Sequence, residues 1–253
     1  MQLNIKHFVI FFTLLCFSCN NQNTKITEIT GRQLLINDTL KAADSIDEYL
    51  IPYKQQINKV LNQPITYNPK TISKYEGEFN TAIGNLIADI VYEQSNPVFN
   101  KRTGKNIDFV LLNNGGIRSI ISEGEVTIRT AYEVMPFENK IVVVELSGNK
   151  ILEMIQHLQK PGKAQPVSRN VEIALNKNLT LNKLLINGKT VDKNKNYFVA
   201  TSDYLSNGGD GMLFFKEPIS TTNLDYLIRN QLIDYFKKVD TIRATIDNRF
   251  IKL

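Results

Sequence analysis

Residues 108–118, which read DFVLLNNGGIR, decide the fold class. The short apolar run at 108–112 predicts a strand buried on both faces of a sheet. It leads directly into Asn-Asn-Gly-Gly, residue types that tolerate a positive φ and favour a tight turn. A second such junction follows, where the predicted strand 197–201 (YFVAT) leads into 207–211 (NGGDG). Such turns let backbone N–H groups converge on an anion without obstruction by a Cβ.

The remaining elements alternate irregularly around these two junctions. Apolar spacing predicts helices over 44–61 (with Pro52 inside), 81–93, 130–134, 149–159 and 223–238, the last capped by Thr222 or Asn223. Strands are predicted at 125–128 and 140–146, an extended segment at 62–73, and a β-rich region at 167–199 with an Asn187-Gly188 hairpin. This pattern predicts an α/β fold of α+β character, with mixed β-sheets and flanking helices.

The N-terminal residues are predicted to be a leader outside the fold. Lys6 precedes an apolar run, 8–17, whose length is typical of a signal-peptide core and too short for a membrane-spanning helix. Ser18 directly before Cys19 resembles a bacterial lipobox, although Cys16 makes the match loose. The expected organisation is a lipoprotein signal peptide at 1–18, a tether at 19–43 and one domain at 44–253. Ordinary secretory cleavage near the same point is the alternative.

Lipid on the thiol of Cys19 would anchor the protein to a membrane of the bacterial cell envelope, facing the periplasm. The only cysteines are Cys16 and Cys19, so the predicted domain has no disulfide, catalytic thiolate or zinc–thiolate site. The net charge of +5 is spread along the chain without a block of Lys and Arg. A spread of this kind does not favour nucleic acid as a partner, because nucleic acid usually requires a clustered basic face.

Several short motifs become specific when they are taken together. A Gly-Gly turn or a Pro-Phe pair is common by itself, and neither glycine turn matches a P-loop or dinucleotide fingerprint. The motifs in chain order are IGNLIAD (83–89), NNGGIR (113–118), GEVT (124–127), PFEN (136–139), LSG (146–148) and YFVATSDYL (197–205) leading to GGDG (208–211). In this order they resemble the C-terminal, substrate-recognising domain of the 5′-nucleotidases, over roughly residues 44–250.

The resemblance implies a nucleotide site. In that family the nucleobase lies between two aromatic rings, here Phe137 and Tyr204, and a carboxylate, here Asp210, binds the ribose. Arg118 matches an arginine on the phosphate side. The full set of implied substrate-binding residues is Asn113, Gly115, Gly116, Arg118, Phe137, Asn139, Tyr204, Gly209 and Asp210. The residue types suit these roles, since aromatic faces stack on bases and guanidinium groups bind phosphate through two N–H groups.

One stretch departs from the family pattern. Family members usually carry one or more arginines and a Glu just before the helix motif. Here residues 74–81 read KYEGEFNT and contain no Arg. We therefore expect weaker phosphate binding, or a preference for nucleosides or larger nucleotides.

No catalytic residue, metal or cofactor is predicted in this chain. A two-metal phosphatase site needs several His with Asp and Asn ligands, whereas the only His after the leader is His157. We expect it to be a structural or surface imidazole, and we expect divalent metals only on a partner metallophosphatase. Three functions remain open: the nucleotide-recognising half of a split nucleotidase, a stand-alone nucleotide-binding lipoprotein of the envelope, and a degenerate scaffold with an empty pocket.

Overall fold

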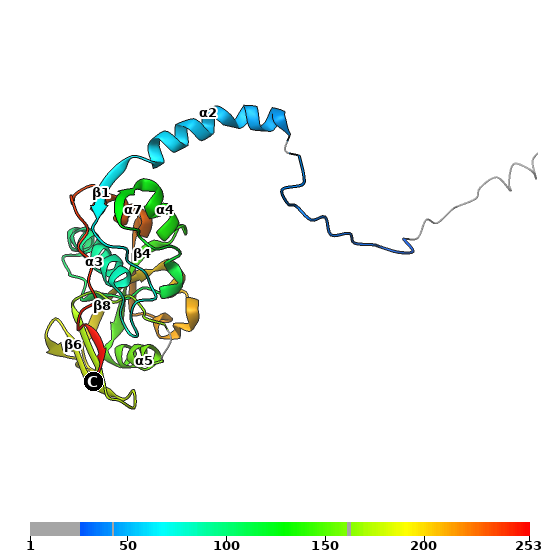
Figure 1. Cartoon of the computed structure of the whole chain (residues 1–253). Helices are drawn as coiled ribbons and strands as arrows, with labels where there is room; N and C mark the ends of the chain where they lie inside the picture. The colour runs from blue at the N-terminus through cyan, green and yellow to red at the C-terminus, as the bar shows by residue number, and fades with distance from the viewer. Residues whose placement is uncertain (1–25, 42, 161–162) are drawn as a thin grey trace, which may run out of the picture. The chain divides into compact units, whose positions relative to one another are not determined.

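The computed structural model describes residues 26–41, 43–160 and 163–253 (Figure 1). The predicted signal peptide and Cys19 lie outside these residues. The chain divides into two units, the second of which comprises Ile51–Leu253. The described residues of the predicted tether, 26–41 and 43, contain no helix or strand, and all of them are exposed. Among the described residues, no helix combines the length and apolar character needed to cross a membrane.

Helices and strands alternate along the chain as the sequence pattern predicts. The helices are α2 (Asp44–Leu61), α3 (Ala82–Thr103), α4 (Ile128–Val134), α5 (Gly148–Leu158), α6 (Asp203–Ser206) and α7 (Ile228–Phe236), with 3₁₀ turns η1 (Asn114–Gly116), η2 (Gly209–Gly211) and η3 (Leu213–Phe215). The strands are β1 (Pro64–Asn68), β2 (Phe109–Val110), β3 (Gly124–Thr127), β4 (Lys140–Ser147), β5 (Val171–Leu175), β6 (Leu181–Ile186), β7 (Lys189–Thr190), β8 (Asn196–Ser202), β9 (Ser220–Leu227) and β10 (Phe250–Lys252). The predicted mixed α/β class is confirmed.

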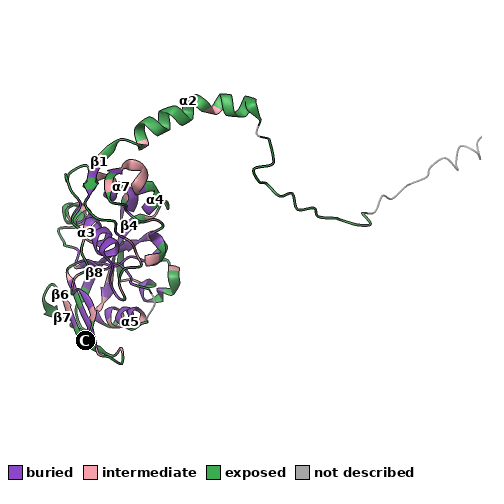
Figure 2. Cartoon of the chain, viewed as in Figure 1, coloured by how far each residue is buried: buried purple, intermediate pink, exposed green. Residues whose placement is uncertain are grey.

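The central sheet has the strand order β2-β8-β4-β9. β2 runs parallel to β8, and the other neighbours are antiparallel. Side chains alternate between the faces of a strand. Phe109 and Val199 therefore face one apolar core, while Val110 and Ala200 face the other. Phe109, Val110, Leu111 and Leu112 are all buried, which explains why 109–112 is apolar without interruption. Figure 2 shows the inner strands β8 and β4 as largely buried.

The first core lies between this sheet and helices α3 and α7. Thr81 caps the N-terminus of α3, and its hydroxyl accepts the backbone N–H of Gly84 at 3.0 Å. The helix continues to Thr103, well beyond the predicted end at residue 93, and contains Pro97. Gly104, with φ of 72°, then ends it in a left-handed conformation.

The second core lies between the central sheet, α5 and a second sheet with the order β10-β5-β6-β7. The predicted hairpin at Asn187-Gly188 joins β6 to β7. Both turn residues have positive φ, 51° and 73° respectively. A two-residue turn with this backbone matches the twist of the flanking strands, so this prediction is confirmed.

The predicted helix over 223–238 is wrong in its first part. Ser220–Leu227 form β9, which pairs antiparallel with β4, and α7 begins only at Ile228. The predicted caps Thr222 and Asn223 are accordingly strand residues paired with Val143 and Val142. The open edge of β4 satisfies the backbone hydrogen bonds of this segment, so tertiary pairing overrides its helical spacing.

α2 contains Pro52 without interruption, and none of its residues is buried. The side chain of Arg129 donates hydrogen bonds of 2.7 Å to Asn62 Oδ1 and to Asn58 Oδ1. These bonds connect the last turns of α2 to the start of α4.

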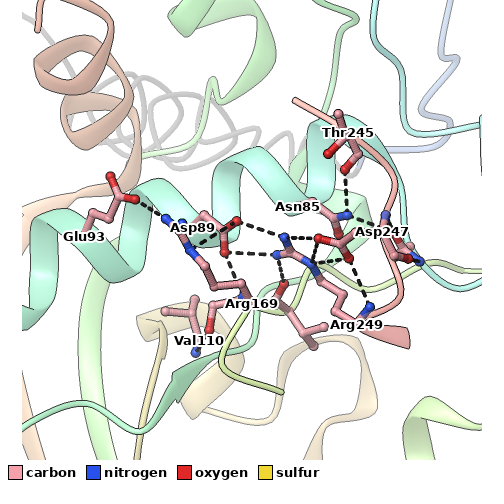
Figure 3. A network of polar contacts seen from close by, with 11 residues as sticks. Asn85, Asp89, Glu93, Val110, Arg169, Thr245, Asp247 and Arg249 are labelled. Carbon is pink, nitrogen blue, oxygen red and sulfur yellow. Dashed lines mark hydrogen bonds and ion pairs between the residues drawn. The ribbon is translucent and has the colours of Figure 1, made fainter. Parts of the chain in front are cut away.

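A polar network ties the C-terminal segment to α3 (Figure 3). The buried guanidinium of Arg249 contacts both carboxylate oxygens of Asp89 at 3.0 and 2.9 Å. It also donates to both oxygens of Asp247 and, at 2.9 Å, to the carbonyl of Val167. Arg169 adds a contact to Asp89 at 3.8 Å. Because a buried cation is costly unless it is paired, these contacts account for an arginine in the interior.

Candidate functional site

A pocket of about 350 Å³ opens at the ends of the two strands that lead into glycine turns. Its lining residues are Asn113, Gly115, Gly116, Arg118, Phe137, Asn139, Tyr204 and Asp210. All of them belong to the predicted substrate-binding set. The remaining member, Gly209, lies against the ring of Tyr204. The structure therefore brings together residues separated by almost a hundred positions in the chain, in a volume that suits a small organic ligand.

The first glycine turn lies close to the carboxylate of the second. Asn113 donates from Nδ2 to Oδ2 of Asp210 at 2.7 Å. A Cβ added to Gly115 would lie 3.2 Å from the Asn113 amide and 3.4 Å from Asp210 Oδ2, while one on Gly116 would lie 3.0 Å from Asn113 Oδ1. Glycine therefore leaves room for both polar side chains at the floor of the pocket. Arg118 follows directly and is exposed at its wall.

The second glycine turn has a backbone that few other residues adopt. Gly208, Asp210 and Gly211 all have positive φ, of 87°, 52° and 73°. A Cβ on Gly209 would lie only 2.5 Å from Cε1 of Tyr204. The turn thus packs its backbone directly against the tyrosine ring and projects the Asp210 carboxylate into the pocket. Asp tolerates this left-handed conformation better than most non-glycine residues.

Phe137 and Tyr204 line the same pocket, and each is 46% exposed. Arg118 lies over the ring of Phe137, with its guanidinium carbon 5.9 Å from the ring centroid. Asn139 also lines the pocket, and its carbonyl accepts the backbone N–H of Ile228 at 3.1 Å. The site therefore has aromatic faces, an amide, a carboxylate and a guanidinium around one hollow.

Lys74 contacts the chain directly before Arg118, which the arginine pattern of residues 74–81 does not predict. Lys74 donates from Nζ to the carbonyl of Ile117 at 2.7 Å. This bond places its ammonium next to the backbone of Arg118. The signal was present in the sequence, since Lys74 is the only basic residue of that stretch.

Arg229 is the second residue that was missed. Its side chain is buried, and it donates from Nη1 to the carbonyl of Pro136 at 3.0 Å, immediately before Phe137. It also lies 3.6 Å from Glu138 Oε1 and stacks 4.2 Å from the ring centroid of Tyr132. No sequence signal marks Arg229, because an arginine in an amphipathic helix usually faces solvent.

His157 lies outside the pocket, in the last turn of α5. Its ring packs edge-on against Phe214, with centroids 5.6 Å apart. Burial, assisted by the charge of Lys160, lowers the pKa of His157 below its usual value. Across residues 26–41, 43–160 and 163–253, no group of three or more His, Cys, Asp or Glu side chains is arranged to hold a metal ion. The expectation that metals reside only on a partner stays a prediction.

Comparison with known proteins identifies the family. Residues 52–217 match the family described as 5′-nucleotidase, C-terminal domain. The chain is 27% identical over 197 residues to a 5′-nucleotidase of Vibrio vulnificus (strain CMCP6), covering 74% of this chain and 33% of that protein. It is 28% identical over 148 residues to Protein UshA of Escherichia coli (strain K12), covering 57% of this chain and 26% of that protein.

The fold agrees with this match. The crystal structure of a 5′-nucleotidase precursor from Thermus thermophilus superposes with a TM-score of 0.68 at 23% identity, over 82% of this chain and 43% of that one. This chain spans a third or less of the two curated relatives. The family match covers well over half of the chain, and the strand ends that form the pocket carry the motifs in order. The chain belongs to the 5′-nucleotidase C-terminal domain family.

Proposed function

We propose that the pocket binds a nucleotide or nucleoside and that the protein acts in nucleotide catabolism together with a separate metallophosphatase. The observation that carries the proposal is the pocket itself, which gathers two exposed rings, a carboxylate and a guanidinium into about 350 Å³. Packing of the hydrophobic core does not require this combination of groups in a solvent-exposed pocket. A nucleotide, in contrast, needs one partner for its base, one for its ribose and one for its phosphate.

The base would stack between Phe137 and Tyr204. Both rings are half-exposed, so stacking a base on them removes apolar surface from water. Such stacking contributes roughly 1–3 kcal/mol per base, and it tolerates any base because every base has a π-face. Asn139 and Asn113 would supply donors and acceptors at the edge of the base.

The ribose would bind through Asp210. Its carboxylate already accepts one bond from Asn113 and one from Tyr204, at 2.7 and 3.0 Å. Each carboxylate oxygen has a further lone pair available for a ribose hydroxyl. Two donors from the protein hold the group in place, so little side-chain freedom would be lost when the ligand binds.

The phosphate would meet Arg118, assisted by Lys74. Arg118 is exposed at the pocket wall and lies near the ring of Phe137. Lys74 Nζ is held beside it through the carbonyl of Ile117. A second cation here would offset the arginines that residues 74–81 lack, although an ammonium binds phosphate as a point charge and without the two-pronged geometry of a guanidinium.

Hydrolysis of the phosphate ester would require metals from another protein. Metal ions activate the attacking water and stabilise charge on the leaving group. The chain offers only His157 beyond its leader. In this proposal the leader and Cys19 place the protein at the cell envelope, where a periplasmic metallophosphatase would receive the bound nucleotide.

Titration calorimetry of the purified domain with adenosine, AMP and UMP tests the binding step. We expect adenosine and AMP to bind and the variants Phe137→Ala and Asp210→Ala to weaken both. Affinities that stay unchanged in both variants would show that the ligand binds elsewhere. A second assay measures phosphate release from AMP by a metallophosphatase that lacks this domain, with and without the chain. Binding without any gain in release would identify a stand-alone nucleotide-binding protein.

A further inference from the structure

The loop that carries Phe137 and Asn139 has an unusual anchor. Arg229, near the start of α7, has only 5% of its surface exposed. Its Nη1 donates to the carbonyl of Pro136 at 3.0 Å. The preceding residue, Ile228, donates its backbone N–H to the carbonyl of Asn139 at 3.1 Å. Two adjacent residues of α7 therefore hold both ends of the loop.

General stability does not explain a buried guanidinium at this position. Its nearest carboxylate, Glu138 at 3.6 Å, is 82% exposed, so water screens most of that attraction. Its Nε is buried and has no hydrogen-bond partner among the described residues. An unpaired buried donor lowers stability. The hydrogen bond of its Nη1 goes instead to the carbonyl of the peptide between Pro136 and Phe137.

The geometry requires an arginine. Its guanidinium carbon lies over the ring of Tyr132, 4.2 Å from the centroid. From there Nη1 donates to the Pro136 carbonyl, and Nη2 lies 3.6 Å from Glu138 Oε1. A lysine can supply one of these contacts but has no planar face to stack.

We propose that Arg229 is a positioning residue for the base end of the pocket. It fixes the peptide plane between Pro136 and Phe137, and this plane sets the direction in which the Phe137 ring leaves the backbone. The inference rests on the proposed nucleotide function, since it assigns the hydrogen bond between Arg229 and Pro136 a role in base recognition. It predicts that a change at Arg229 affects the base and leaves the phosphate end unaltered.

The test compares Arg229→Met and Arg229→Lys with the matched control Arg102→Met. Arg102 also donates to backbone carbonyls, those of Asn223 and Leu224, but away from the pocket. Titration calorimetry uses adenosine, AMP and ribose 5-phosphate. Arg229→Met should weaken adenosine and AMP by the same factor, about tenfold, as expected when a charged hydrogen bond is lost. Ribose 5-phosphate should bind unchanged. Arg229→Lys should restore part of the loss, and Arg102→Met should bind like the unaltered chain.

A second measurement follows the mobility of the Phe137 loop itself, in the absence of any ligand. Hydrogen exchange followed by mass spectrometry should show faster exchange at the amides of 137–139 in Arg229→Met, with that of 115–118 unchanged. Unchanged exchange at 137–139, or an equal loss of ribose 5-phosphate, would overturn the positioning role. If the unaltered chain binds none of the ligands, the nucleotide proposal and with it the assignment to base recognition are overturned. If Arg229→Met does not fold, Tyr132→Leu removes the stacked, 42% exposed ring and must give the same pattern.

Discussion

Tyr204 and Asp210 are joined twice. The tyrosine hydroxyl donates to Oδ1 of the Asp210 carboxylate at 3.0 Å and accepts the backbone N–H of the same residue at 3.2 Å. One side chain of the pocket therefore offers an aromatic face and also holds the neighbouring carboxylate in its left-handed turn. Phe is common at the position of Tyr204 in this family, and a phenylalanine cannot make either hydrogen bond.

Tyr204→Phe should therefore weaken ribose recognition more than stacking. Loss of a net hydrogen bond of about 1 kcal/mol lowers affinity for adenosine roughly fivefold. Affinity for 2′,3′-dideoxyadenosine should change less, because that ligand lacks the 2′- and 3′-hydroxyls that Asp210 would bind. Calorimetry with the two ligands measures the difference. An equal loss of affinity for both ligands would mean that the Tyr204 hydroxyl affects only stacking on its ring and not ribose binding by Asp210.

Gly209→Ala should displace the tyrosine ring. The added Cβ would lie 2.5 to 2.7 Å from three atoms of that ring, a separation that packed atoms do not adopt. Affinity for adenosine should fall at least about tenfold, as expected when a stacking partner is lost. Gly31→Ala is the control, since a Cβ there meets nothing within 4 Å. Adenosine affinity equal to that of the control would contradict the tight packing of this turn.

Substitutions at the phosphate end of the pocket should weaken AMP binding without changing the binding of the base. Arg118→Met should weaken AMP by about tenfold and leave adenosine unchanged, because charge-assisted bonds to phosphate are the strong ones. Lys74→Met should act in the same direction with a smaller effect, and Lys70→Met, an exposed neighbour, should not. The AMP affinity should also fall as salt is added. Equal losses of affinity for adenosine and AMP would show that Arg118 and Lys74 do not bind the phosphate.

Arg249→Met should lower the free energy of unfolding without acting on the pocket. Removal of one partner from a buried ion pair costs about 3–5 kcal/mol, and the lower end applies because Asp247 is 39% exposed. Urea unfolding at pH 7 measures the change. Arg243→Met, an exposed arginine beside the same network, is the control and should have little effect.

The same network predicts a dependence of stability on pH. Burial raises the pKa of Asp247, but the hydrogen bonds and charge of Arg249 outweigh it and hold the pKa below its ordinary 3.8. A carboxyl with a depressed pKa stabilises the fold above the unfolded value and loses this contribution as the pH falls through the folded value. Stability should therefore drop below about pH 4. In Arg249→Met this acid-dependent drop should be smaller, and an unchanged drop would assign it to other carboxyl groups.

Much of the candidate site could be predicted because its parts are local. A strand followed directly by a glycine turn is a feature of adjacent residues, as in 108–118 and 197–211. The residue types at those turns have few alternative roles, since positive φ at Gly208 and Gly211 requires glycine or a close substitute. Only the meeting of the two turns needed more than local information, and the order of the family motifs supplied it.

The features that the sequence did not predict correctly share a different physical cause. Leu224 and Leu227 fit a helical stripe, yet Ser220–Leu227 pair with the edge of β4. Arg229 has the composition of a surface residue, yet it is buried under the loop of Phe137. The neighbours of Lys74 in the sequence do not indicate that its ammonium contacts the carbonyl of Ile117. In each case the deciding contact is with a residue far along the chain.

The amino-acid sequence by itself determined the apolar strands, the two glycine turns, the mixed α/β class and the residues expected around a nucleotide. The strands, turns and fold class follow from backbone preferences and from periodic burial, which act over a few neighbouring residues, whereas the residues expected around a nucleotide follow from the resemblance to the 5′-nucleotidase motifs. Only the tertiary structure decided that Ser220–Leu227 form a strand, that an arginine of α7 holds the aromatic loop, and that Tyr204 and Asp210 bond to each other. Hydrogen-bond partners on other elements determined these outcomes, because a buried polar group takes the partner that the packed fold brings to it.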